Sequence, residues 1–162
     1  MGRRNFLVEG VSGTGKTSVC RELQRRGHRA VNGDTELAYQ GDPGTLEPTD
    51  VPAHEHHLWR VDAVRALVED RSVAATFFCG GSRNVRSLLP LYDAVFVLRV
   101  DAGTLERRLA RRPPGEFGGR PEERELALRL HRTGEDVPEG VEIDATQPLA
   151  AVVDRILELA GC

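Results

Sequence analysis

Short apolar runs alternate along the chain with longer segments in which apolar residues recur every three or four positions. The runs have the length of buried strands, and the segments between them have the period of amphipathic helices. Strands are predicted at 5–10, 28–34, 72–81, 93–100 and 141–146. Strands separated by helices predict an α/β fold with a five-stranded parallel sheet flanked by helices, because parallel strands need long crossover connections.

The helical segments are equally regular. In the segment 56–71 the apolar residues from Leu58 to Val68 have mostly helical spacing, which predicts one helix through the whole segment. The segments 39–55 and 113–121 are rich in glycine and proline and are predicted to be loops. Further helices are predicted at 16–26, 84–91, 101–112, 122–134 and 149–160.

Composition limits the class of protein. A length of 162 residues predicts a single domain, 1–162, with room for a real core. The formal charge of -3 gives no reason to expect nucleic acid as a partner. The chain contains no run of eighteen apolar residues, so no membrane span is predicted. Three widely separated cysteines favour reduced thiols in a cytoplasmic protein, with Cys20 and Cys79 buried and inert.

The segment GVSGTGKT, Gly10–Thr17, carries the most specific signal. It matches the phosphate-loop pattern of glycine, four residues, glycine, lysine and then serine or threonine, and it lies between a predicted strand and a predicted helix. Lys16, the only lysine beside twenty-one arginines, occupies the required position, where a compact ammonium can reach the β- and γ-phosphates. Residues predicted to hold a nucleotide here are Gly10, Val11, Ser12, Gly13, Thr14, Gly15, Lys16, Thr17 and Ser18.

A phosphate loop at the start of so short a chain resembles the adenylate kinase-like group of P-loop kinases, which includes shikimate kinase, gluconate kinase and antibiotic phosphotransferases. The resemblance covers most of the chain, although only the loop is highly specific. It implies a three-layer P-loop fold, an acceptor-binding segment at about 34–70, a short lid at about 113–121, and ATP with Mg²⁺ as cofactors. Thr17 and Asp34 would be the protein's ligands to the magnesium ion.

Two strand ends are expected to face the acceptor. By the resemblance, Asp34 orients the acceptor hydroxyl and accepts its proton, although an aspartate here can also simply cap a helix. Gly80 and Gly81 would admit the acceptor against the backbone, and Arg83 would clamp a carboxylate or phosphate, unless it is an ordinary surface residue of a tight turn.

Arginines gather near the predicted lid. Arg108 and Arg112 are four residues apart, so on a helix they share one face, and with Arg120 they match the lid arginines that the resemblance places over ATP phosphates. A solvated basic face balanced by glutamates is the alternative. The turn from Ala145 to Pro148 resembles the family's adenine-contacting segment.

Histidines cluster around the only tryptophan. A metal site is disfavoured for His54, His56 and His57, because no cysteine or further histidine complements them. His57 and Trp59 are candidates for acceptor contact, with packing as the alternative.

The sequence thus predicts an ATP- and Mg²⁺-dependent phosphotransferase acting on a small molecule, either a nucleoside or nucleotide or a hydroxylated metabolite. Its partners would be ATP and that acceptor, and it would be a monomer or homodimer. The alternative is a nucleotide-binding switch with slow hydrolysis, against which the chain lacks an Asn-Lys-x-Asp guanine-reading motif.

Overall fold

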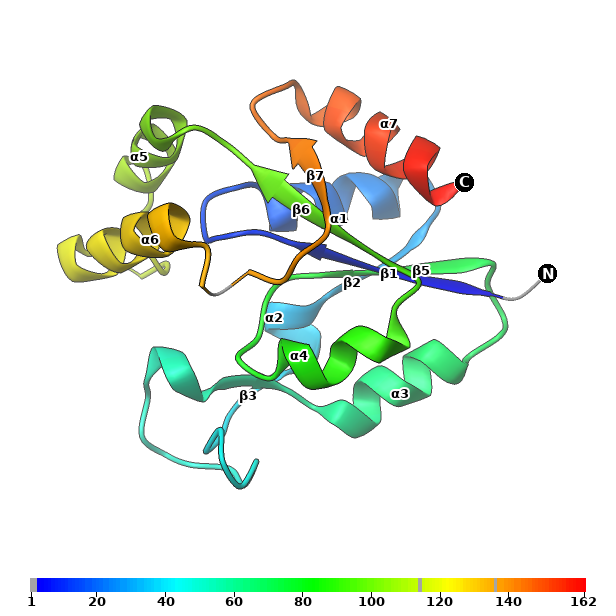
Figure 1. The fold of residues 1–162 in the computed structure, drawn as a ribbon, viewed down its shortest axis with the longest axis horizontal. Helices are drawn as coiled ribbons and strands as arrows, with labels where there is room; N and C mark the ends of the chain where they lie inside the picture. The colour runs from blue at the N-terminus through cyan, green and yellow to red at the C-terminus, as the bar shows by residue number, and fades with distance from the viewer. Residues whose placement is uncertain (1–2, 114, 136) are drawn as a thin grey trace.

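The computed structural model describes residues 3–113, 115–135 and 137–162. Its centre is a five-stranded sheet in which every neighbouring pair is parallel, in the order β2-β5-β1-β6-β7 (Figure 1). The strands are β1 (Arg4–Glu9), β2 (Arg29–Asn32), β5 (Ala75–Cys79), β6 (Ala94–Arg99) and β7 (Val141–Asp144). All five predicted strands and the parallel sheet are therefore confirmed.

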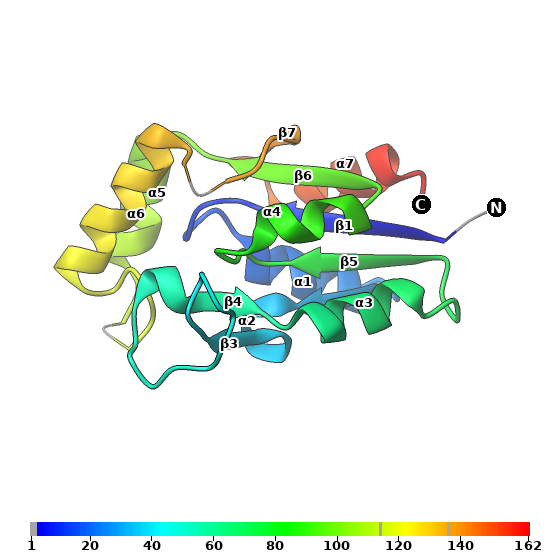
Figure 2. The ribbon, with the colours of Figure 1, turned by 60° about the horizontal axis from the view of Figure 1, so that its bottom comes forward.

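Helices cover both faces of the sheet and make the three layers. Helices α1 (Lys16–Arg25) and α7 (Leu149–Ala160) pack on one face, and α3 (Val61–Glu69) and α4 (Val85–Leu88) on the other (Figures 1 and 2). Each face has its own apolar cluster because alternate strand residues point to opposite sides: Phe77 belongs to the α1 side and Phe78 to the α3 side.

Two further helices lie beyond the carboxyl ends of the strands. They are α5 (Ala102–Ala110) and α6 (Pro121–Thr133), which pack against each other (Figures 1 and 2). Asp101 caps α5 as its side chain accepts the N–H of Thr104 at 2.7 Å. Helix α5 ends at Ala110, earlier than the predicted end at Arg112. Arg112 therefore lies past the helix, and the prediction that Arg108 and Arg112 share one helical face is wrong.

The segment 34–70 departs most from prediction. Strands β3 (Ala38–Gln40) and β4 (His57–Trp59) form a separate antiparallel pair, after the four-residue helix α2 (Gly33–Glu36) and before α3. The predicted helix 56–71 is wrong at its start, because the backbone around Leu58 pairs with β3 instead of following helical spacing. The predicted loop 39–55 likewise begins inside β3 and ends in the 3₁₀ turn η1 (His54–His56).

The remaining predictions concern a short helix, two cysteines, the lid and membrane spans. The predicted helix 84–91 is the short α4 followed by the 3₁₀ turn η2 (Leu89–Leu91). Cys20 and Cys79 are buried free thiols, as predicted. The predicted lid 113–121 consists of turns up to the start of α6, and its Pro114 lies outside the described residues. No helix in the described ranges is both long and apolar enough to cross a membrane.

Candidate active site

One cavity of about 1070 Å³ lies at the carboxyl ends of β1, β2 and β5, and residues of α5 and α6 also line it. The phosphate loop lines one part of it, and residues of the acceptor segment and of the β5–α4 turn line another. The sequence-predicted residues that it brings together are Gly10 to Ser18, Asp34, His57, Gly81, Arg83, Arg108, Arg112, Arg120 and Ala145. Trp59, Gly80 and Pro148 do not line it.

The loop after β1 has the backbone that its glycines permit. Gly10, Gly13 and Gly15 have φ values of 155°, 95° and 107°, which side-chain-bearing residues rarely adopt. A Cβ at Gly13 would lie 2.7 Å from Leu105 of α5, so this glycine also allows the loop to pack under that helix. The loop then runs into the N-terminus of α1, a combination suited to binding phosphate oxygens.

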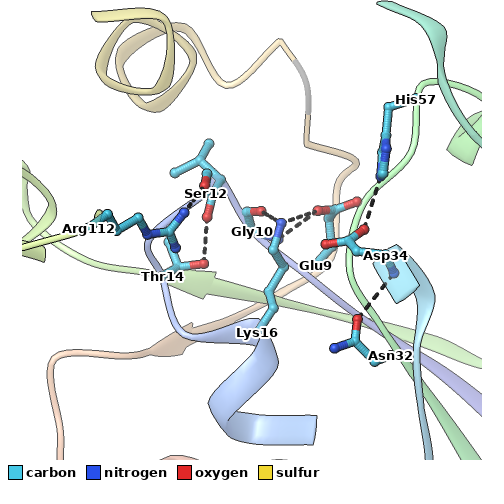
Figure 3. Close-up of polar contacts among 10 residues, drawn as sticks. Glu9, Gly10, Ser12, Thr14, Lys16, Asn32, Asp34, His57 and Arg112 are labelled. Carbon is cyan, nitrogen blue, oxygen red and sulfur yellow. Dashed lines mark hydrogen bonds and ion pairs between the residues drawn. The ribbon is translucent and has the colours of Figure 1, made fainter. Parts of the chain in front are cut away.

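Lys16 points back over the floor of the loop (Figure 3). Its Nζ donates to the carbonyl of Gly10 at 2.5 Å and lies 3.6 Å from Oε1 of Glu9. The ammonium therefore sits at the junction of the loop and the last residue of β1.

Glu9 is a charged residue that sequence reasoning missed. It follows the buried apolar residues Phe6 to Val8 at the end of β1 and is only 2% exposed, and its Oε1 accepts the N–H of Gly10 at 2.9 Å. Burial raises the pKa of Glu9 to about 7, against the opposing effects of Lys16 and of that hydrogen bond. A glutamate at the end of the buried run FLVE was the available signal, because such a strand rarely carries a charge without a partner.

Asp34 lies across the cavity floor from the loop, within α2 (Figure 3). Its N–H is accepted by the side chain of Asn32, and its Oδ1 lies 3.0 Å from Nε2 of His57. Burial would raise the pKa of Asp34, but the bond from His57, the charge of Lys16 and the backbone of Gly81 together hold that pKa below its ordinary value. Asp34 is therefore ionised at neutral pH.

The glycine pair after β5 makes room for the protein's own groups. A Cβ at Gly81 would lie 2.5 Å from Oε1 of Glu9, and one at Gly80 would lie 3.0 Å from Oδ1 of Asp34. Gly80 therefore does not line the cavity, and its missing side chain leaves room for Asp34 and Trp59. Trp59 does not line the cavity either: its ring is 1% exposed and packs against Gly33 and Gly80, so the predicted contact of Trp59 with an acceptor is not supported.

Two arginines tie the α5 end to the phosphate loop. Arg108 donates to the carbonyls of Gly13, Thr14 and Ala145 at 3.3, 3.2 and 3.0 Å. Arg112 donates to Oγ of Ser12 at 2.7 Å and to the carbonyl of Phe117 at 2.5 Å. Although Arg112 lies beyond the helix, both guanidinium groups thus reach the loop. Their predicted contact with ATP phosphates stays a prediction.

The lid also touches the acceptor segment. The ring of Phe117 stacks on His54 with 5.8 Å between ring centroids. Arg83 lies nearby on the cavity wall, and its backbone N–H donates to the carbonyl of His57 at 2.8 Å. These contacts join the lid, the acceptor segment and the β5–α4 turn at one side of the cavity.

Two oxygen-bearing side chains of the cavity fit the coordination chemistry of magnesium. Thr17 and Asp34 both line the cavity, and a hydroxyl with an ionised carboxylate fits the preference of Mg²⁺ for oxygen ligands. Within the described residues there is no cluster of three or more histidines, cysteines or acids able to hold a metal by itself. Thr17 and Asp34 would therefore supply only part of the coordination of a Mg²⁺ ion, and phosphate oxygens and water would supply the rest.

No protein-family model and no curated protein sequence matches this chain. Solved structures do match it over nearly its whole length. A sugar kinase from Janibacter sp. HTCC2649 superposes with a TM-score of 0.62 at 20% identity, covering 99% of this chain and 95% of that one. A shikimate kinase from Bacteroides thetaiotaomicron gives 0.65 at 14% identity, covering 98% and 99%. A deoxyadenosine kinase from M. mycoides with bound dATP gives 0.54 at 14% identity, covering 99% and 100%. Likeness at such identities concerns the fold, and the fold is that of the P-loop kinases.

Proposed function

We propose that this protein is an ATP- and Mg²⁺-dependent phosphotransferase that moves the γ-phosphate of ATP to a small-molecule acceptor. The observation that carries the proposal is the single cavity shared by the phosphate loop, by Asp34 and by Arg83. A nucleotide bound along the loop would place its terminal phosphate towards that carboxylate and guanidinium. The solved kinases of the same fold support the reaction class.

In this reaction the loop and α1 bind the polyphosphate, with Lys16 on the terminal phosphates. Thr17 and Asp34 would hold Mg²⁺, which when bound neutralises charge on the phosphate oxygens. Asp34, already ionised and fixed by His57, orients the acceptor hydroxyl towards the phosphorus. Phosphoryl transfer is catalysed mainly by positioning the reactants and stabilising charge. The contacts that fix Lys16 and Asp34 would therefore contribute directly to the rate.

Arg108 and Arg112 would stabilise the loop and the charge that develops during transfer. Their bonds to the carbonyls of the loop and to Ser12 hold both guanidinium groups at the cavity wall. The lid residue Phe117, held by Arg112 and stacked on His54, would keep water from the acceptor region.

The acceptor is a nucleoside or nucleotide, or a hydroxylated metabolite. Its part of the cavity is mainly polar, with Asp34, His57, Ser82 and Arg83, and no tryptophan or tyrosine lines the cavity in the described part of the chain. These polar groups suit the hydroxyl and anionic groups that both classes of acceptor carry.

The test is ADP release from ATP and Mg²⁺ with a panel of nucleosides, nucleotides, polyols and hydroxy acids. We expect release that depends on one acceptor class and a phosphorylated product detectable by mass spectrometry. Slow release that no acceptor accelerates would instead identify a nucleotide-binding switch and would refute the proposed transfer reaction.

A further inference from the structure

Glu9 lies at the end of β1, directly beneath the phosphate loop (Figure 3). Its Oε1 accepts the N–H of Gly10 and lies 3.6 Å from Nζ of Lys16. Its Oε2 is shielded from solvent and has no hydrogen-bond partner among the described residues. An ionised carboxylate in such a place depends strongly on its neighbouring cation, because burial withholds the water that would otherwise stabilise the charge.

Lys16 is that cation, and a nucleotide would compete for it. In the structure its ammonium is drawn inward, to the carbonyl of Gly10 and to Glu9, and its side chain is 16% exposed. A polyphosphate in the loop offers several charged oxygens to the same ammonium. Once Lys16 turns to the phosphates, Glu9 loses attraction, and the new negative charge above it adds repulsion.

We propose that Glu9 is a positioning residue for Lys16 and that nucleotide binding is coupled to proton uptake by the Glu9 carboxyl group. In the free protein the ionised carboxylate holds Lys16 at the floor of the loop. In the nucleotide complex Lys16 pairs with phosphate, and a proton from the buffer acid forms an O–H bond on Glu9, which leaves that side chain neutral. The inference rests on the proposed function only in requiring a polyphosphate in the loop.

The surroundings of Glu9 fix the sign of the effect. Burial raises its pKa to about 7 in the free protein, the charge of Lys16 and the Gly10 N–H lower it, and the charge of Asp34 raises it. Other titratable groups around the floor include His57, which is paired with Asp34, and Tyr92, whose own pKa is raised by burial and by the charge of Glu9. The pKa of Cys79, at the end of β5, is raised by its hydrogen bond with Cys20 and by burial. Withdrawal of Lys16 raises the pKa of Glu9 further. The affinity for nucleotide should therefore fall as pH rises through about 7.

The experiment is calorimetric binding of the β,γ-imido analogue of ATP in two buffers with different ionisation enthalpies. At pH 7 the wild-type protein should take up about half a proton more than Glu9→Gln, which keeps the shape of the side chain but cannot ionise. From pH 6 to pH 8 the wild-type Kd should rise about tenfold relative to that of Glu9→Gln. The comparison removes the titration of the nucleotide itself, because this is common to both proteins.

Glu142→Gln is the matched control, since Glu142 is an exposed glutamate on β7 outside the cavity. It should retain the wild-type proton uptake. Equal proton uptake in wild type and Glu9→Gln would overturn the inference. If Glu9→Gln does not fold, carbon-13 NMR of the Glu9 carboxyl in the wild type decides the question: its pKa must rise when the analogue binds, and an unchanged or lower pKa overturns the inference.

The outcomes separate this inference from the proposed function. Proton-coupled binding without acceptor-dependent ADP release would refute the phosphotransferase and leave the role of Glu9 standing. Binding and turnover without the coupled proton would refute only the role of Glu9. A wild-type protein that does not bind the analogue would overturn both.

Discussion

Replacement of Gly33 by alanine should force a methyl group into the ring of Trp59. A Cβ at position 33 would lie 2.0 Å from Cζ2 and 2.4 Å from Cε2 of that ring, whereas carbon atoms in contact are normally about 3.5 Å apart or more. Trp59 is 1% exposed and packs in the α3-side cluster, so the ring has no open space to swing into. Gly33 does not have a positive φ, so the expected cost is steric and not a matter of backbone strain.

Overpacking of a well-filled core costs typically about 1 to 3 kcal/mol, and the size of this overlap places Gly33→Ala near 3 kcal/mol. At this chain length each kcal/mol lowers Tm by about 2 to 4 °C, so Tm should fall by roughly 6 to 12 °C. Trp59→Phe should relieve the overlap. By itself it should cost only about 1 kcal/mol, because the lost packing is offset by removal of the Nε1–H, which is buried without a partner among the described residues.

Urea unfolding followed by far-ultraviolet circular dichroism measures these effects, since fluorescence would be lost with the only tryptophan. Gly33→Ala combined with Trp59→Phe should be more stable than the sum of the single variants by at least about 1 kcal/mol. Gly115→Ala is the control, because a Cβ at Gly115 would meet no heavy atom of the described residues within 4 Å. The reasoning fails if Gly33→Ala matches this control or if the double variant is additive.

Three further variants test the cavity itself. Lys16→Ala should fold normally but weaken binding of ATP about 100-fold, as calorimetry would show, because it removes charge-assisted bonds to phosphate; undiminished affinity would contradict the assigned position of the polyphosphate. Asp34→Asn should bind ATP within about threefold of wild type but lose about 10² to 10⁴ in kcat with the acceptor found in the panel, and an unchanged kcat would remove Asp34 from the reaction. Arg108→Ala should raise the Kd for ATP about tenfold by freeing three carbonyls that hold the loop, a prediction that an unaltered Kd would contradict.

The parts of the structure that follow from local pattern were predictable. The phosphate loop is defined within eight residues, and each central strand is an apolar run, so neither depends on distant contacts. The segment around Leu58 was not predictable in the same way. Its apolar spacing suits a helix. Pairing of Leu58 with Tyr39 in an antiparallel ladder satisfies the same backbone groups, and local sequence does not distinguish the two structures.

The glycines after β5 show why the floor of the site could not be read from the sequence. A Gly-Gly pair at a strand end predicts that something approaches the backbone closely, and a substrate was the natural candidate. What approaches is Glu9 at Gly81, with Asp34 and the ring of Trp59 at Gly80. Those neighbours come from three separate segments, so only the fold brings them together.

This arrangement explains how the ammonium of Lys16 is held at the floor of the loop. Gly81 lets Glu9 stand under the loop, and Gly80 with Gly33 lets the indole pack behind Asp34. Two carboxylates thereby lie on the floor near Lys16, one buried and easily protonated, the other held ionised by His57. Their environments push their pKa values in opposite directions. On the proposed mechanism, the buried carboxylate would therefore release Lys16 to the nucleotide, while Asp34 would keep its charge for the acceptor and for Mg²⁺. Replacement of Gly80 or Gly81, whose added Cβ would meet Asp34 or Glu9, should therefore change the ratio of nucleotide affinity to turnover before it changes the fold of the loop.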